Sequence, residues 1–315
     1  MPQSRPFAQV DVFTAQAYLG NPLAVVLDGA GLDEAAMQSF ARWTNLSETT
    51  FVLPPTPEAA AQGADYQVRI FTPSGELPFA GHPTLGSCHA WLQAGGVPRT
   101  AGRIVQQCQM GLIQIRQDGT RLAFAAPPLQ RRDPSPSHLA QVAAALGLQA
   151  RHIVAAQVLD NGPVWLGLML DSVDTVLQLR PDHLALKNLG SKVGVAHVEY
   201  AQTAPSLIAR SNREARAFGS RNVASTAAPA TADEATLEVR AFAAPMGVSE
   251  DPVTGSLNAS LAQWLIAEGR APARYTAHQG TCLDRDGRVY IEQDSTGQVW
   301  VGGDSVTCIR GTVTL

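Results

Sequence analysis

Lysine is scarce in this chain of 315 residues, in which only Lys187 and Lys192 occur. Charged residues make up 16% of the sequence, and the formal net charge is −4. The other basic groups are arginines, which form no polybasic run, whereas a nucleic-acid-binding surface is usually basic. The sequence therefore predicts that the protein has no nucleic-acid partner.

Cysteine clusters are also missing. The four cysteines lie far apart, and the sequence has no CxxC pair and no Cys/His group with zinc spacing. We expect buried free thiols in a reducing compartment and no metal site. The alternative is that Cys88, which follows a helix-start motif, acts as a single nucleophile.

Long apolar segments and several functional fingerprints are absent too. Residues 1–10 lack the apolar core of a signal peptide, and no apolar run approaches the ~18 residues that span a bilayer. We therefore expect a cytoplasmic protein without a membrane partner. The P-loop, the dinucleotide fingerprint and the G-x-S-x-G motif of hydrolases do not occur either.

The chain does contain the material for a large core, because 45% of its residues are hydrophobic. Its length typically forms two domains. Prolines and arginines are concentrated in residues 127–136, which we interpret as a linker. The predicted halves are 1–126 and 137–303, and a return of the final strand, about 304–315, to the first half is left open.

Two helix starts can be assigned from capping residues. Asp33 is a predicted N-cap, and the helix after it places Trp43 at helical spacing with other apolar residues. Ser137 is the predicted N-cap of a helix that stops at Gly147.

Short strands dominate the rest of both halves. In the second half we expect strands at 206–209 and 282–286 and a surface loop at 223–235. Each half also has one long apolar helix, and this combination favours a curved sheet wrapped around a central helix over an alternating parallel sheet.

A six-residue phrase occurs twice with Pro, Gly and Ser in the same places. The copies, 169 residues apart, are His82-Pro83-Thr84-Leu85-Gly86-Ser87 and Asp251-Pro252-Val253-Thr254-Gly255-Ser256. Both run into an apolar helical pattern, so each is expected to start a helix. The repeat suggests a duplication that brings two helix N-termini, with His82 and Asp251 just before them, to one cleft.

The first copy has residues that suit an anion site. Gly81 allows close backbone approach, and the free N–H groups of a first helical turn attract a carboxylate. His82 can exchange a proton near neutral pH. The alternative interpretation is that His82 merely caps the helix.

The second copy offers a similar choice. Asp251 before a proline is either an N-cap or a proton-handling carboxylate. Ser256 lies in the first turn, where its hydroxyl can bind a ligand oxygen, and Gly255 leaves the backbone N–H groups accessible.

Glu48 is the third candidate. It stands between a predicted helix end and an apolar strand. If the start of that strand lies in the cleft, desolvation raises the pKa of the carboxyl group and suits it to move a proton between carbons. The alternative is a solvated glutamate at a strand end.

Taken together, four motifs resemble those of the PhzF (phenazine biosynthesis) family. They are Gly20-Asn21-Pro22, Ser47-Glu48-Thr49, Gly81-His82-Pro83-Thr84 and Glu250-Asp251-Pro252-Val253-Thr254-Gly255-Ser256. The resemblance implies an α+β fold like that of diaminopimelate epimerase. Its two pseudo-symmetric domains are each a barrel-like, mostly antiparallel sheet around a central helix. It also implies an enzyme without cofactor or metal, and we expect a homodimer.

The resemblance assigns a role to each candidate. Glu48 is the implied acid/base and His82 and Asp251 its catalytic partners, and the substrate is a small carboxylate of the dihydro-hydroxyanthranilate kind. Ser256, with the backbone of Gly81 and Gly255, is implied to bind this substrate.

An isomerase is the leading hypothesis. The alternatives are an epimerase or dehydratase acting on an amino or hydroxy acid, and a non-catalytic protein that binds small carboxylates.

Overall fold

The computed structural model describes residues 2–200 and 235–315. The strand expected at 206–209 lies outside the described residues, as does the loop expected at 223–235 apart from Ala235, which begins a strand.

The first half is a sheet around one helix. Its strands are β1 (Ser4–Val12), β2 (Asn21–Val26), β3 (Glu48–Leu53), β4 (Tyr66–Thr72), β5 (Gly75–Leu77), β6 (Arg103–Cys108), β7 (Gly111–Asp118) and β8 (Arg121–Ala125). Its helices are α1 (Glu34–Thr44), α2 (Pro57–Ala61) and the central α3 (Gly81–Gln93). Along the sheet, β2–β3 and β4–β6 pair parallel and the other neighbours antiparallel.

The second half repeats this plan. Its strands are β9 (Gln130–Arg132), β10 (Ile153–Asp160), β11 (Val164–Leu170), β12 (Val193–Tyr200), β13 (Ala235–Ala243), β14 (Val248–Asp251), β15 (Arg274–Gln279), β16 (Gly287–Gln293) and β17 (Val299–Gly303). Its helices are α4 (Pro136–Leu146), α5 (Val173–Gln178), α6 (His183–Asn188) and the central α7 (Gly255–Ala267). Here β11–β12 and β13–β15 are the parallel pairs.

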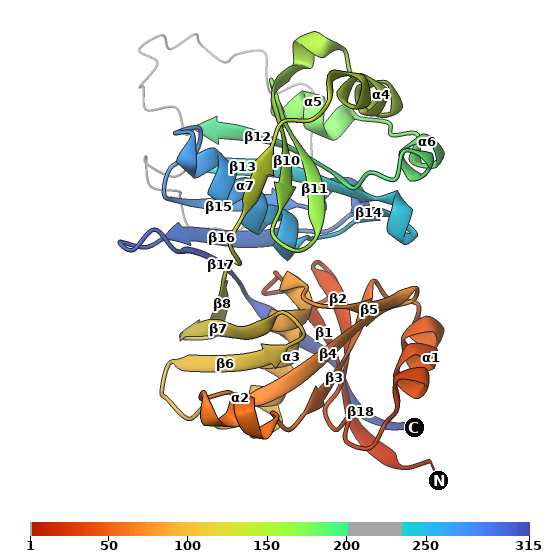
Figure 1. The fold of residues 1–315 in the computed structure, drawn as a ribbon, viewed down its shortest axis with the longest axis vertical. Helices are drawn as coiled ribbons and strands as arrows, with labels where there is room; N and C mark the ends of the chain where they lie inside the picture. Colours follow the sequence, from red (N-terminus) through yellow and green to blue (C-terminus); the bar gives the residue numbers. More distant parts are fainter. Residues whose placement is uncertain (1, 201–234) are drawn as a thin grey trace, which may run out of the picture.

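The order of antiparallel and parallel pairings is the same from β1 to β8 as from β10 to β17, so the halves are related by pseudo-symmetry. Strand β8 also pairs with β17, which joins the halves. Figure 1 shows them stacked, with α3 inside one and α7 inside the other. The predicted fold class is confirmed.

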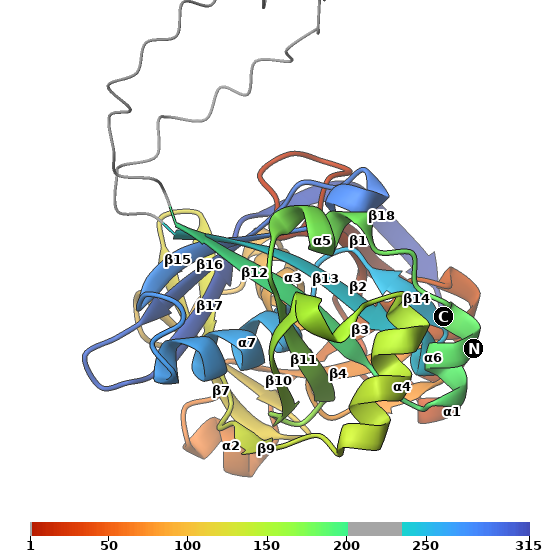
Figure 2. The ribbon, with the colours of Figure 1, turned by 90° about the horizontal axis from the view of Figure 1, so that it is seen from above.

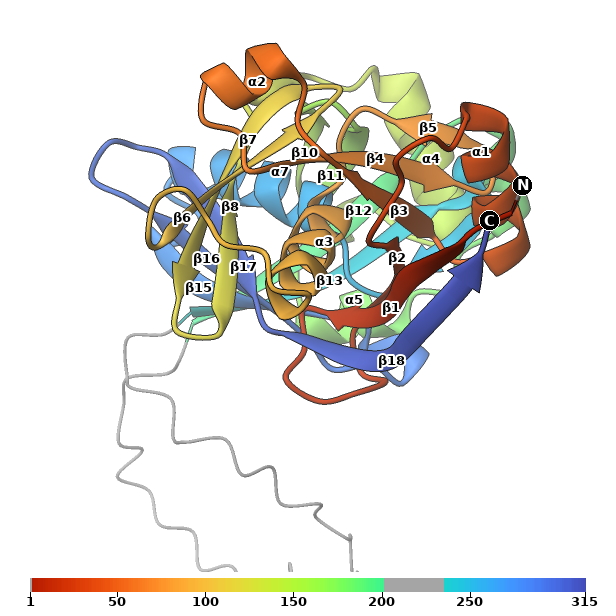
Figure 3. The ribbon, with the colours of Figure 1, turned by 90° about the horizontal axis from the view of Figure 1, so that it is seen from below.

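The last strand, β18 (Ser305–Thr314), leaves the second half and pairs antiparallel with β1. The two strands lie side by side in Figure 3, and the chain termini lie close together in Figure 1. We propose on this basis that 304–315 belongs with 1–126. Residues 127–136, predicted as a linker, contain β9, which pairs with β10.

The two central helices are buried nearly all round, because each is enclosed by its own sheet. Nine of the 13 residues of α3 and ten of the 13 of α7 are buried. Helices α4, α5 and α6 instead lie outside the second sheet (Figure 2), over a separate apolar cluster.

The two copies of the six-residue motif do not superpose under the pseudo-symmetry that relates the halves. Helices α3 and α7 are equally long and begin at Gly81 and Gly255, which are 174 rather than 169 residues apart. A Cβ built on Gly81 would lie 2.8 Å from the Cα of Gly255, so these two glycines meet backbone to backbone. The structural counterpart of His82 is therefore Ser256, not Asp251.

Two further consequences correct the sequence analysis. His82 is the second residue of α3 rather than the residue before it, and Asp251 ends β14, four residues before α7, so it does not cap that helix. Ser87, the presumed partner of Ser256, instead donates to Thr50 in the core at 2.8 Å.

Three local predictions were also wrong. Trp43 is 81% exposed and stacks on Phe40 rather than entering the core. The N-cap of α4 is Ser135, whose hydroxyl accepts from the His138 N–H. The helix begins at Pro136, so Ser137 is its second residue rather than its cap. Residues 282–286 form no strand, since a 3-10 turn ends there at Asp284 in the left-handed conformation.

The contact between the helix N-termini gives a stability prediction. Gly255→Ala should lower the free energy of unfolding by about 1–3 kcal/mol, because the added Cβ meets backbone that cannot move aside. The exposed Gly311, which has no atom within 4 Å of an added Cβ, is the control. Gly311→Ala should change stability by less than about 0.5 kcal/mol. If chemical denaturation showed equal losses of stability for Gly255→Ala and Gly311→Ala, the close packing at Gly255 would be contradicted.

Candidate functional site

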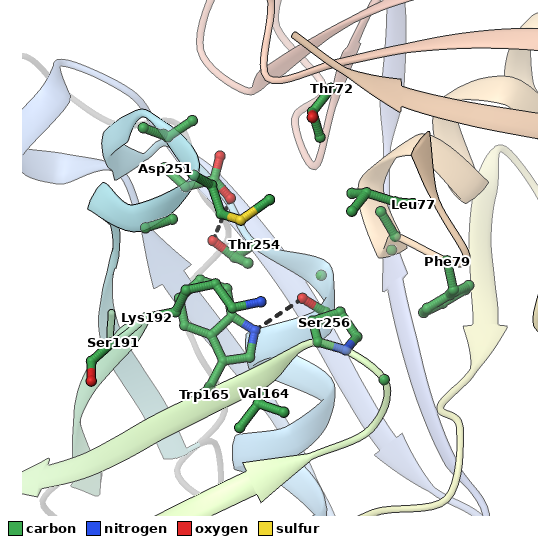
Figure 4. Close-up of a pocket in the computed structure, with 18 of the residues that line it drawn as sticks. Thr72, Leu77, Phe79, Val164, Trp165, Ser191, Lys192, Asp251, Thr254 and Ser256 are labelled. Carbon is green, nitrogen blue, oxygen red and sulfur yellow. Dashed lines mark hydrogen bonds between the residues drawn. The ribbon is translucent and has the colours of Figure 1, made fainter. Parts of the chain in front are cut away.

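A cavity of about 640 Å³ lies between the halves and is lined by residues of both. From the first half it receives Ser47, Glu48, Thr72, Leu77–Gly81 and His82, and from the second half residues that include Trp165, Lys192, Asp251, Thr254, Gly255 and Ser256. Figure 4 shows part of this lining. All six predicted site residues reach this cavity, so the structure brings them together.

Glu48 and His82 form the contact at its centre. Glu48 is the first residue of β3, His82 lies in the first turn of α3, and Glu48 Oε2 is 3.3 Å from His82 Nε2. The side chains are 15% and 4% exposed. Neither atom of this contact has a hydrogen-bond partner among the described residues.

Burial decides the protonation states of this pair. Desolvation, with the charge of Asp251 adding to it, raises the pKa of Glu48 to about 8, although Lys192 lowers it. Burial lowers the pKa of His82 to about 3. At neutral pH the contact is therefore mainly between a carboxylic acid and a neutral imidazole, and the proton stays on Glu48.

Asp251 is held by a polar network instead of capping a helix. Its Oδ1 accepts from Asn21 Nδ2 at 2.8 Å, and its Oδ2 accepts from the hydroxyl of Thr254 at 2.6 Å. Burial raises the pKa of Asp251 to about 6, while these two hydrogen bonds oppose the shift. Asp251 is therefore mostly ionised at neutral pH.

Asn21 connects this carboxylate to the first half. Its amide nitrogen also donates to the carbonyl of Val253 at 2.8 Å and lies 3.4 Å from His82 Nδ1. Because an amide has two protons, the two short bonds use both, and the contact with His82 is secondary. Asn21 belongs to a turn motif already noted in the sequence, but its bridging role was not predicted.

Gly81, Gly255 and Ser256 form the helix mouths. First-turn N–H groups have no acceptor within their own helix, and both mouths open on the cavity. The hydroxyl of Ser256 accepts from Trp165 Nε1 at 3.3 Å, a bond drawn in Figure 4. The three residues thus offer donors to an anion.

Sequence reasoning missed several cavity residues. Lys192 and Trp165 lie together, with the ammonium 5.1 Å from the ring centroid. Ser191 and His138, also in the lining, are hydrogen-bonded at 2.7 Å. The sequence did contain a pattern that could have identified Lys192. Ser191-Lys192 stands at the start of a β-branched segment, as Ser47-Glu48 does in the first half.

Cys88 does not fit the nucleophile alternative. The thiol is fully buried and absent from the cavity lining, and burial raises its pKa to about 12. A thiolate is the reactive form of cysteine, so this environment makes Cys88 unreactive.

Within residues 2–200 and 235–315, no group of three or more His, Cys, Asp or Glu side chains is arranged to hold a metal ion. No helix within the same residues is long and apolar enough to cross a membrane.

Comparisons with known proteins agree over nearly the whole chain. The PhzC-PhzF model, described as phenazine biosynthesis-like protein, matches residues 10–311. The chain is 33% identical to antisense-enhancing sequence 1 of Schizosaccharomyces pombe, covering 97% of each chain. It is 31% identical to the trans-2,3-dihydro-3-hydroxyanthranilate isomerase of Pseudomonas aeruginosa, covering 97% of this chain and 98% of the relative.

Solved structures share the fold. The PhzF-family protein of Bacillus anthracis superposes with a TM-score of 0.75 at 20% identity, covering 99% of this chain and all of the other.

The protonation of Glu48 predicts how stability depends on pH. Because the folded pKa is about 8 and the ordinary value 4.5, the folded protein keeps a proton that the unfolded chain releases. Stability from this group is full below pH 4.5 and is lost as the pH rises through 8. Between pH 7 and 8 Asp251 contributes little slope, because its folded pKa is about 6. His82 contributes a slope of opposite sign, which fades as the pH rises above the ordinary pKa of 6.5 that the unfolded chain has.

In this window Glu48 alone should lower the free energy of unfolding by up to about 1.4 kcal/mol per pH unit. Glu48→Gln should reduce this slope, and the difference between the two proteins at each pH isolates the contribution of Glu48. Glu58→Gln, at an exposed position of α2, is the matched control. The raised pKa of Glu48 would be contradicted if chemical denaturation gave the same pH dependence of the free energy of unfolding for the wild type and Glu48→Gln.

Proposed function

Because the chain belongs to the PhzC-PhzF family of phenazine biosynthesis-like proteins and is an isomerase of that family, we propose that it moves a proton within a small carboxylate bound in the cavity between its halves. The proposed substrate is a cyclic compound of the dihydro-hydroxyanthranilate kind, as the names of several relatives suggest. No cofactor is part of this proposal.

The observation that carries the proposal is the buried contact between Glu48 and His82. A group exchanges protons best when its pKa lies near the working pH. Burial brings the pKa of Glu48 to about 8, whereas an ordinary glutamate is ionised and a weak base at neutral pH.

The reaction then needs only one group that gives and takes a proton. A pKa of about 8 leaves a minor fraction of Glu48 ionised at neutral pH, and this carboxylate removes a proton from a ring carbon and becomes the acid. As acid, it returns the proton to another carbon of the same conjugated system, so atoms and charge balance. The Nε2 of His82 lies 3.3 Å from Glu48 Oε2, and an imidazole nitrogen can donate to a carboxylate or accept from a carboxylic acid, according to its tautomer.

Asp251 and the helix mouths have supporting roles in this proposal. Burial keeps the proton on Glu48 in the resting site, and the negative charge of Asp251 adds to this effect. Ser256 and the first-turn N–H groups at Gly81 and Gly255 bind the carboxylate of the substrate. The ring then lies against the apolar part of the lining.

The proposed reaction can be followed by the deuterium that it transfers from D₂O to a carbon atom of the product. With trans-2,3-dihydro-3-hydroxyanthranilate in D₂O, the wild type should shift a double bond and place solvent deuterium on carbon to the extent that Glu48 exchanges its proton with solvent, as followed by proton NMR. Glu48→Gln should lower kcat by about 10²–10⁴-fold, because the amide cannot transfer the proton. Full activity of Glu48→Gln would show that another group shuttles the proton.

The same measurement separates the alternatives. An epimerase would keep the carbon skeleton and the double bonds and invert one centre, whereas a dehydratase would release water. A carboxylate-binding protein would bind the compound without any exchange of carbon-bound hydrogen. The cytoplasmic location and the homodimer stay predictions, the second of which light scattering can check.

A further inference from the structure

Lys192 is a cation of the cavity lining and lies just before β12. It forms no close ion pair with a described side chain, although the charges of Asp160 and Glu48 act on it from farther away. Its ammonium lies 5.1 Å from the ring centroid of Trp165, whose indole N–H donates to the hydroxyl of Ser256. Figure 4 shows these three side chains together.

The position of Lys192 follows from the pseudo-symmetry. Strand β3 begins at Glu48, which pairs with Leu23 of β2, and β12 begins at Val193, which pairs in parallel with Leu166 of β11. The residue before Val193 is Lys192. Lys192 thus lies one residue before the counterpart of Glu48, and the two halves send ionisable groups of opposite charge into the cavity from neighbouring positions at equivalent strand starts.

The charge balance of the cavity favours an anionic ligand. Glu48 holds its proton at neutral pH, which leaves Asp251 as the main negative charge, and two hydrogen bonds within the protein already engage it. Lys192 and the more exposed Arg132 are the cations of the lining. Burial disfavours the charged form of Lys192, so an ammonium in this place gains from a bound anion.

We propose that Lys192 is the counter-ion of the substrate's carboxylate, which it holds beside Trp165 and Ser256, and that it restricts the site to anionic substrates. The inference rests on the proposed function for the location of the substrate in this cavity. When Glu48 removes a proton from carbon, negative charge spreads toward the carboxylate, and the ammonium is placed to stabilise that charge.

A charge-matched pair of small ligands tests the role of Lys192. Benzoate and benzamide have the same shape and differ in charge. The wild type should bind benzoate more tightly than benzamide in calorimetric titrations. Lys192→Met should weaken benzoate binding about 10- to 100-fold and leave benzamide binding nearly unchanged.

Two variants serve as controls. Lys192→Arg keeps the positive charge and should retain most of the benzoate affinity. Lys187→Met removes the only other lysine, which is exposed on α6, and should behave as the wild type. Equal benzoate affinity in Lys192→Met and the wild type would overturn the proposal, as would an equal loss of benzamide binding.

A measurement on the unaltered protein covers the case in which Lys192→Met does not fold. The chain has two lysines, so protein labelled with lysine carrying carbon-13 at Cε gives two side-chain signals. Benzoate should shift the Lys192 signal and raise the pKa it reports, while the Lys187 signal stays in place. A Lys192 signal that does not respond to saturating benzoate would overturn the proposal.

Failure of the proposed function gives a different result. Benzoate binding through Lys192 without a double-bond shift in trans-2,3-dihydro-3-hydroxyanthranilate would refute the proposed reaction and leave the counter-ion role intact. Isomerisation by the wild type, together with unchanged benzoate affinity in Lys192→Met, would support the proposed reaction and refute the counter-ion role of Lys192.

Discussion

The backbone contact between Gly81 and Gly255 is the constraint on which the site depends. Because neither residue has a side chain, the N-termini of α3 and α7 approach until their backbones touch. Both positive helix ends then point into one space, where they repel each other and attract negative charge. The contact thus joins the two halves and also creates the need for an anion at their junction.

The protein meets part of this need with acidic side chains. Asp251, fixed by Asn21 and Thr254, brings a carboxylate beside the helix ends. Its charge and the exclusion of water keep the proton on Glu48, and the same burial keeps His82 neutral. The protonation states are therefore a consequence of packing, because the same three residues in water would have their ordinary pKa values.

The sequence predicted the parts of the site better than their arrangement. Glu48, His82, Asp251 and Ser256 could be picked out because their motifs are local. The register of the duplication could not, since Pro, Gly and Ser recur at an offset of 169 while the helices superpose at 174. Only backbone positions show that Ser87 faces the core and that the counterpart of Ser256 is His82.

The place of Lys192 in the cavity could not be predicted from the sequence for a similar reason. Glu48 begins β3 and Lys192 directly precedes β12, two strands that are far apart in the chain. Only the sheet shows that each of these strands pairs in parallel with its neighbour. Sequence alone likewise placed Trp43 in the core, because periodicity does not reveal where a helix face ends.

The duplication has become asymmetric in a way that fits the chemistry. At equivalent helix mouths the first half supplies an imidazole and the second a hydroxyl, and near equivalent strand starts they supply an acid and an ammonium. A symmetric pair of bases would act on opposite faces of one carbon, which suits inversion. A single acid opposite a fixed cation instead suits movement of a proton between two carbons of one anion, because the cation can stabilise the charge while the proton is away.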